Sequence, residues 1–310
     1  MEKIIIGRLQ SSQWDEISAL IFNSLDRWYS ENLKRPTMLG GPESMRFFAE
    51  IYEDLDPGCC VTATCPESGQ IVGTCFYHPR ETHLSLGIMA VHPEFGGRGI
   101  ARTILDVIVH LASDQGLPIR LVSSAMNLDS FSLYSKAGFV RQETFQDLLI
   151  TVPESGLTPL PPNQKQVRQA TSSDIARIVA LERELIGISR EQDYAFFLKN
   201  KDALWHSLVA ETSRGEITGF LCSIDHPNMR MLGPGVSRDE ETSLALIHHE
   251  LHHSRRGQSL IFLVPTSSAT LVKKLYQWGA RNTEIHFSQA LGKTPETTGI
   301  VIPTFMPESG

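Results

Sequence analysis

The feature that most constrains the fold is a repeated plan, because the chain reads as two successive halves with the same order of elements. Each half opens with an apolar β-branched run and an amphipathic helix, in residues 3–25 and 167–186. Each continues with two apolar runs around a turn, in 59–78 and 207–224, a pattern typical of a β-hairpin. Both halves then carry a short helix that ends in Tyr and Gly, LYSKAGF and LYQWGA.

A proline-rich segment, TVPESGLTPLPPNQKQ, separates the two halves and has no apolar periodicity. We therefore predict a first domain over residues 1–152, a linker over 153–166 and a second domain over 167–310. A chain of 310 residues fits two domains, at roughly 100–200 residues each. The mixture of hairpins and helices predicts an α+β fold, in which each domain has a mixed, mostly antiparallel sheet flanked by helices.

The composition is that of an ordinary globular protein, with 41% hydrophobic and 20% charged residues. No stretch approaches a signal peptide or a membrane span, so we expect a cytoplasmic protein without a membrane partner. The five cysteines lack a paired CxxC spacing and are expected to be reduced. Up to residue 155 there are 12 Lys and Arg against 19 Asp and Glu, which disfavours nucleic acid and favours a cationic substrate.

A glycine-rich stretch, VHPEFGGRGIAR, follows a strand-like run at 84–91 and precedes a helical pattern that begins at Ile100. The N-terminus of a helix offers unpaired N–H groups and the positive end of the helix dipole, both of which suit a phosphate. Glycine allows the backbone to approach such a ligand closely. The stretch matches neither the Walker pattern nor GxGxxG, so taken alone it stays open between a phosphate site and a flexible turn.

A second motif, NLDSFSLYSKAGF, lies at residues 127–139 and has the form NxxSxxLYxKxGF. Together with GGRGIA at 96–101, it resembles the GNAT family of acyl-CoA-dependent N-acyltransferases, whose loop reads [R/Q]xxGx[G/A]. Gly96 stands where the family usually has Arg or Gln. The resemblance covers roughly residues 3–150 and implies a tandem GNAT protein whose first domain is active.

The resemblance implies acetyl-CoA as cosubstrate and assigns a role to each matching residue. It implies that the pantetheine arm pairs with the backbone of Met89, Ala90 and Val91. It implies that the pyrophosphate is held by the amides of Gly97, Arg98, Gly99, Ile100, Ala101 and Arg102. Asn127 would contact pantetheine, or alternatively cap the following helix. Tyr134 would protonate the departing thiolate, or alternatively serve as a core aromatic residue.

The general base is not identified by the resemblance. Some family members carry Glu on the strand before the asparagine motif, where this chain has Val122. Glu81 and His83 are the candidate substitutes at the start of the strand that leads into the loop. Glu53 and Asp54 lie before the first hairpin, and each of these four is first expected to be a surface residue.

The second half keeps the order of elements and loses the motifs, so it resembles a degenerate GNAT domain. Its counterpart of the glycine loop contains Asp239, Glu240 and Glu241, whose charge would repel CoA. These acidic residues are more favourable as the first turn of a helix. We expect this half to act structurally, by completing the core, by closing one side of the acceptor pocket or by forming an oligomer contact, and a homodimer stays open.

The sequence HELHH at 249–253 matches the zinc-protease pattern, with His249 and His253 as ligands and Glu250 as base. On a helix, however, His249 and His253 lie on the side opposite the apolar stripe, toward solvent. The stripe consists of Leu244, Ile247 and Leu251. We therefore expect no metal site.

The expected function is transfer of an acetyl group from acetyl-CoA to a primary amine, by direct attack in a ternary complex. The acceptor is a small-molecule or peptide amine of unspecified identity. Two alternatives are a non-catalytic acyl-CoA-binding sensor module and a zinc hydrolase built on HELHH.

Overall fold

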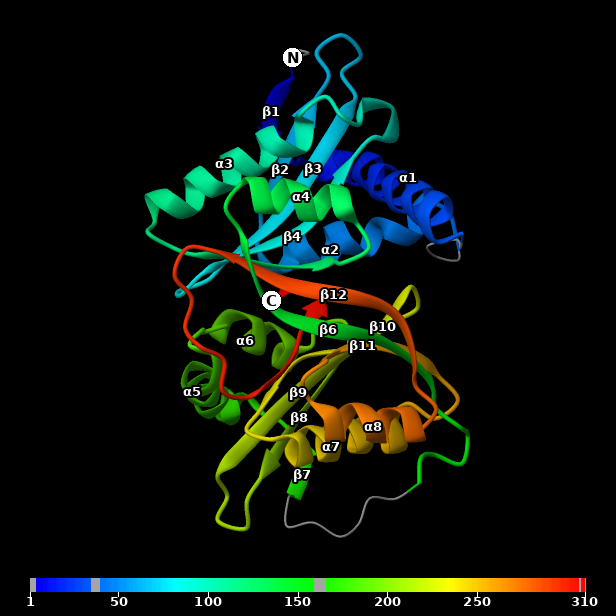
Figure 1. Cartoon of the computed structure of the whole chain (residues 1–310), viewed down its shortest axis with the longest axis vertical. Helices are drawn as coiled ribbons and strands as arrows, with labels where there is room; N and C mark the ends of the chain where they lie inside the picture. Colours follow the sequence, from blue (N-terminus) through cyan, green and yellow to red (C-terminus); the bar gives the residue numbers. More distant parts are fainter. Residues whose placement is uncertain (1–3, 35–39, 159–165, 307, 310) are drawn as a thin grey trace. The chain divides into compact units, whose positions relative to one another are not determined.

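The computed structural model describes residues 4–34, 40–158, 166–306 and 308–309 (Figure 1). The first half contains β1 (Ile5–Arg8), α1 (Trp14–Leu33), α2 (Arg46–Leu55), β2 (Cys60–Thr64), β3 (Ile71–Pro79), β4 (Leu84–Val91), α3 (Ile100–Asp114), β5 (Ile119–Ser124), α4 (Leu128–Lys136) and β6 (Val140–Thr151). The second half contains β7 (Gln166–Gln169), α5 (Ile175–Ile186), α6 (Glu191–Lys199), β8 (Trp205–Glu211), β9 (Ile217–His226), β10 (Met229–Ser237), α7 (Glu240–His249), β11 (Ser259–Pro265), α8 (Ala269–Gln277) and β12 (Arg281–Leu291). The same order of strands and helices occurs twice, which confirms the repeated plan and the α+β class.

Three short strands follow the second repeat, namely β13 (Ile300–Ile302), β14 (Thr304–Phe305) and β15 (Glu308–Ser309). Short 3-10 turns precede α1, α2, α3 and α5, and a π-helix (Glu250–Ser254) continues directly from α7. Among the described residues no helix combines the length and the apolar character needed to cross a bilayer.

The chain divides into two compact units that do not coincide with the two halves of the sequence. The first unit contains β1 to β4 and α1 to α3, and the second contains nearly everything from Arg120 onward together with Arg80–Thr82. Most of β5 and all of α4 and β6 therefore belong to the second unit, although they are part of the first half. The domain limits at 152 and 167 stay a prediction about the repeat. Residues 159–165 of the predicted linker lie outside the described residues.

The first unit is a layered structure around the antiparallel strands β1-β2-β3-β4. Helix α3 lies so close to β3 that a Cβ atom on Gly73 would be 2.6 Å from a methyl carbon of Ile100. The opposite face of β3 carries Phe76, whose ring contacts Tyr52 of α2 at 5.0 Å between centroids. Because successive side chains of a strand point to opposite faces, α2 and α3 cover opposite faces of this sheet.

The second unit has the strand order β5-β12-β6-β11-β10-β9-β8-β7. In this order the last strand of each half, β6 or β12, lies beside a strand of the other half. β12 of the second half lies beside β5 of the first, where the Ala125 amide donates to the Ile285 carbonyl at 2.8 Å. β6 of the first half lies beside β11 of the second, with Ser259 opposite Thr151. The two halves therefore complete each other's sheets.

The second unit repeats the packing devices of the first. A Cβ atom on Gly219 of β9 would lie 2.6 Å from a methyl carbon of Thr242 in α7. Phe220 points to the other face and contacts Tyr194 of α6 at 4.9 Å between ring centroids. The core under α7 and α8 is built from both halves, since it includes Leu148 of β6 and Phe262 of β11, both fully buried.

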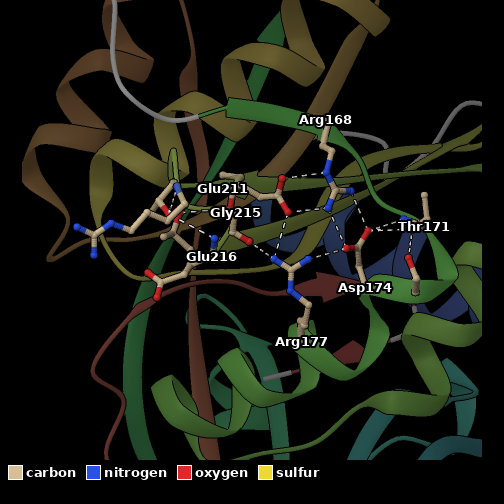
Figure 2. A network of polar contacts seen from close by, with 12 residues as sticks. Arg168, Thr171, Asp174, Arg177, Glu211, Gly215 and Glu216 are labelled. Carbon is tan, nitrogen blue, oxygen red and sulfur yellow. Dashed lines mark hydrogen bonds and ion pairs between the residues drawn. The ribbon is translucent and has the colours of Figure 1, made fainter.

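A network of charged side chains fixes the start of the second half (Figure 2). The guanidinium of Arg168 in β7 pairs with Asp174 at 2.8 Å and with Glu211 of β8 at 2.7 Å. These hydrogen bonds hold the pKa of both carboxyl groups below their ordinary range. Asp174 also accepts from the Thr171 amide at 2.9 Å, so the two residues form a capping box at the start of this helical segment.

The five cysteines are all free thiols, as the sequence predicts. Burial raises the pKa of the Cys60 and Cys222 thiols to about 12, so neither is a reactive thiolate at neutral pH.

Candidate active site

The turn between β4 and α3 is open at the start of the helix. Its N-cap residue is Gly99, with φ at 85°, and Gly97 has φ at 74°, so both occupy the left-handed region that favours glycine. A Cβ atom at either position would meet nothing within 4 Å. In the described part of the chain, the amides of the first helical turn, Ile100 to Arg102, meet no hydrogen-bond acceptor. Such a helix start is suited to an anion.

The side chains of this turn are engaged with their own loop. The Arg98 guanidinium lies 4.7 Å from the centre of the Phe95 ring and donates to the Glu94 carbonyl at 3.0 Å. Arg102 pairs with Asp106 one helical turn later, at 2.8 Å. An anion at this turn would therefore meet mainly backbone donors, as expected from the sequence.

The strand that leads into the turn ends with Met89, Ala90 and Val91. These residues are paired on one side with Cys75, Thr74 and Gly73 of β3. They share the first unit with Gly97–Arg102, so the unit contains the predicted pantetheine strand and the predicted pyrophosphate loop. Their roles toward a cofactor stay predictions.

Asn127 and Tyr134 lie together on α4, in the second unit. Asn127 is the N-cap residue, and its side-chain oxygen accepts from the Ser130 amide at 3.0 Å, so the capping alternative is confirmed. Tyr134 is only 6% exposed, and its ring lies 5.6 Å from that of Phe139. Tyr134 is therefore a core aromatic residue of α4, and its catalytic role stays a prediction.

The candidate bases differ sharply in environment. Glu81 is exposed and forms an ion pair with Arg183 of α5, in agreement with the expectation of a surface residue. His83 is completely buried, so that expectation is wrong for His83. His83 immediately precedes β4, and its burial could not be inferred from the local sequence. Glu53 accepts from the Gly58 amide at 3.0 Å and so stabilises the turn after α2.

The corresponding turn of the second half is short and closed. Only Arg238 and Asp239 separate β10 from α7, whereas residues 92–99 separate β4 from α3. The Asp239 carboxylate caps α7 by accepting from the Thr242 amide at 2.7 Å. Glu240 accepts from the Leu271 amide at the start of α8, at 2.5 Å. The acidic residues thus belong to helix starts, as the sequence indicates.

The end of β10 is also covered by the chain itself. Gly73 of β3 pairs with Val91, and its counterpart Gly219 of β9 pairs with Ser237. By this register, residues 235–237 of β10 correspond to Met89–Val91 of β4. These residues pair antiparallel with β13, and Ser237 lies opposite Ile300. The second half therefore fills with its own strand the position that the first half is predicted to offer to pantetheine.

The HELHH stretch departs from the geometry of the zinc-protease pattern. Glu250 is buried, binds Arg255 at 2.7 Å and accepts from the Ser223 hydroxyl at 2.6 Å, so it has a structural role. His253 is exposed, and its ring lies 4.7 Å from that of His249. The residues from Glu250 on are wound as a π-helix, which changes the i to i+4 geometry that the zinc motif requires.

One buried polar group was not anticipated from the sequence. Asp147, Glu284 and His286 place their ligand atoms within 4.8 Å of one another. They come from two strands 137 residues apart in the chain, so no local motif could reveal them. Burial lowers the pKa of His286 to about 3, which keeps its imidazole neutral at physiological pH.

Comparisons with known proteins agree with this architecture. A family model described as Acetyltransferase (GNAT) family matches residues 22–139, and another described as Acetyltransferase (GNAT) domain matches 178–286. A putative acetyltransferase from Pyrococcus horikoshii is similar in structure, with a TM-score of 0.72 at 15% identity over 96% of this chain and 92% of that one.

Two further solved structures share the fold over nearly the whole chain. A GCN5-related N-acetyltransferase from Sphaerobacter thermophilus has a TM-score of 0.66 at 18% identity, over 94% of this chain and 96% of that one. A tandem GNAT protein from the clavulanic acid biosynthesis pathway has a TM-score of 0.61 at 13% identity, over 95% of this chain and 100% of that one. At these identities the likeness concerns the fold.

Among curated proteins, the UPF0157 protein YqkA of Bacillus subtilis (strain 168) is 30% identical over 89 residues, which is 28% of this chain. The chain spans about a quarter of that relative's length, since the match covers 26% of it.

Two domains of this kind in one chain define a tandem acyltransferase architecture. The protein belongs to the GNAT family of acetyltransferases, with one GNAT domain in each half. Membership supports an acyl-transfer activity, and the family uses acetyl-CoA.

Proposed function

We propose that the protein is an N-acetyltransferase that moves an acetyl group from acetyl-CoA to a primary amine by direct attack in a ternary complex. The observation that supports this most is the uncapped, glycine-lined start of α3, between residues 97 and 102. Fixed backbone N–H groups at a helix N-terminus bind a pyrophosphate without needing a charged side chain.

In this proposal the amine nitrogen attacks the thioester carbonyl carbon, and the carbon–sulfur bond breaks as the amide forms. The backbone of Met89–Val91 aligns the pantetheine arm, with Asn127 as a further contact. The Tyr134 hydroxyl gives its proton to the departing thiolate, which a phenol can do at neutral pH. A base must accept the proton from the attacking amine, and Glu81 and His83 remain the candidates.

The second half supplies no second cofactor site in this proposal. Asp239 occupies the helix start that would hold pyrophosphate, and β13 occupies the strand edge that would hold pantetheine. We therefore propose one acetyl-CoA per chain, bound by the first domain. The acidic balance of residues 1–155 favours a cationic amine, either a small molecule or a peptide, as acceptor.

The proposal is tested by replacing Gly99 with Asp in the full chain and measuring acetyl-CoA binding by calorimetry. The carboxylate would repel the pyrophosphate in the open space beside residue 99, and we expect a loss of affinity of about 100-fold or more (~2.7 kcal/mol). Gly99→Asn is the matched control, because Asn has the same shape, lacks the charge and tolerates positive φ. Micromolar affinity retained in Gly99→Asp would contradict the assignment of the loop.

A thiol-release assay over a panel of amines separates the enzyme from the sensor alternative. The enzyme releases CoA thiol with at least one amine in the panel. A sensor binds acetyl-CoA with the same affinity and releases thiol with none.

A further inference from the structure

Three side chains of types that can bind metals are buried together on the two exchanged strands, β6 and β12. The proposed acyl-transfer mechanism uses none of them. Asp147 lies on β6, and Glu284 and His286 lie on β12. Their exposed fractions are 7%, 4% and 5%. Ionisable side chains are seldom buried this deeply unless they pair or bind a metal.

The strand register brings the three side chains to one point of the sheet. Asp147 and Glu284 are directly opposite each other in the antiparallel pair β6–β12. His286 follows Glu284 by two residues and so points to the same face. The alternate residues point the other way, since Leu148 joins the core under α7 and α8 and Phe287 contacts Phe131 of α4.

The charges of this group favour a bound cation. Two carboxylates directly opposite each other across a strand pair repel, and burial strengthens that repulsion. The neighbouring imidazole can offer a nitrogen lone pair beside the two carboxylates. The Ser124 hydroxyl of β5 donates a hydrogen bond to Glu284, which fixes the carboxylate as outer-sphere partners of metal ligands do.

We propose that Asp147, Glu284 and His286 bind one divalent transition-metal ion, of the Zn²⁺ or Mn²⁺ type. Two carboxylates and an imidazole form a mixed oxygen and nitrogen donor set that such ions accept. Ligands ~2.1 Å from an ion lie up to ~4 Å apart, so the observed spacing of up to 4.8 Å closes with small side-chain rotations.

The burial of all three ligands favours a bare ion over an organic ammonium group, which needs a path wide enough for its substituents. The ion would link β6 of the first half to β12 of the second and so stabilise the pairing of these two strands. This departs from the expectation, drawn from the sequence, that the protein binds no metal. The proposal does not depend on acetyl transfer, so the two can fail separately.

The test uses the untagged full chain, stripped of metal with a chelator, in a His249→Gln/His253→Gln background that removes adventitious binding by the HELHH helix. Zn²⁺ and Mn²⁺ are titrated by calorimetry, and Co²⁺ absorption reports the ligand field. We expect one ion per chain and a higher Tm with metal. Asp147→Asn, Glu284→Gln and His286→Gln should each weaken binding by about tenfold or more, a lower bound taken from the loss of outer-sphere partners.

Glu143→Gln, on the same strand outside the group, is the matched control and should bind the metal as the parent does. The proposal is overturned if none of the metals binds below millimolar concentration, or if the three variants bind as tightly as Glu143→Gln. It is also overturned if metal leaves the Tm unchanged while Glu284→Gln raises it, because the carboxylates would then share a proton. The proposal would also be overturned if calorimetry showed that an amine of the acceptor panel, instead of a metal, saturates the site formed by the three side chains.

Discussion

The turn from β4 to α3 and the turn from β10 to α7 stand at the same place in the two repeats and differ in what they leave open. The first spans residues 92–99, contains three glycines and leaves the first amides of α3 without a side-chain cap. The second consists of Arg238 and Asp239, and the Asp239 carboxylate accepts from the first turn of α7. The start of α3 has no side-chain cap, whereas the start of α7 is capped by the Asp239 carboxylate.

The strands that lead into these two turns also differ in whether a further segment of the second half pairs with their ends. In the second half, β13 pairs with residues 235–237, the counterparts of Met89–Val91. The second half therefore keeps the fold by supplying from its own chain both a carboxylate and an extended segment. A carboxylate and an extended segment of the chain thus lie at the positions where we propose that the first half binds acetyl-CoA.

The paired tyrosines show the third difference. Tyr134 on α4 is 6% exposed, whereas Tyr276 on α8 is 45% exposed and its hydroxyl bonds to Gln146 at 2.6 Å. Both follow a Leu and precede a Gly, so the local sequence alone does not distinguish them.

The largest expected effect comes from removing one half, because each half completes the other's sheet. Residues 1–152 expressed alone lack β12 and so leave the β5 edge unpaired; we expect no cooperatively folded monomer. Co-expression of 1–158 with 166–310 should restore a folded pair, measured by gel filtration and thermal unfolding. A stable monomer of 1–152 that binds acetyl-CoA would show that the exchanged strand is dispensable.

Tyr134→Phe is expected to have the next largest effect. It removes the proposed proton donor while keeping the buried ring, so turnover should fall by about 10²-fold or more with little change in acetyl-CoA affinity. Tyr276→Phe is the matched change in the second half and should turn over as the wild type does. Steady-state kinetics and calorimetry check both, and equal turnover of the two variants would remove the distinction between the repeats.

Asp239→Ala should have the smallest effect. Loss of an N-cap side chain costs about 1 kcal/mol, so a modest decrease in the free energy of unfolding is expected. Asp239→Asn keeps the capping oxygen and should be close to wild type. Because β13 still covers β10, neither variant should bind a second acetyl-CoA, and calorimetry that gave two molecules per chain would break the comparison.

Much of this comparison could be predicted from the sequence. The repeat appears in the apolar patterns, and the predicted strand at 84–91 coincides with β4. The helix predicted from Ile100 begins there because glycine precedes it. The acidic start of α7 is predicted from residue type alone, since acidic side chains are favourable in the first turn of a helix.

The long-range pairings could not be predicted in this way. The apolar pattern of a strand such as β6 or β12 does not indicate which strand it pairs with. The exchange therefore cannot be predicted from the sequence pattern. The pairing of β13 with β10 and the group formed by Asp147, Glu284 and His286 arise from the same register. The surface position predicted for His83 is wrong, because the local sequence does not show that its side chain is buried.

The exchange of β6 and β12 also has a consequence for synthesis on the ribosome. Ser124 of β5 meets Glu284 of β12 across 160 residues of chain. At about 5–20 residues per second, roughly 8–32 s pass after β5 is made before its partner exists. During that interval the nascent first half has an unpaired strand edge, which is covered only after β12 has been translated. Folding of the first half is thereby coupled to synthesis of the second, so that a product terminated before β12 would be left without a finished sheet.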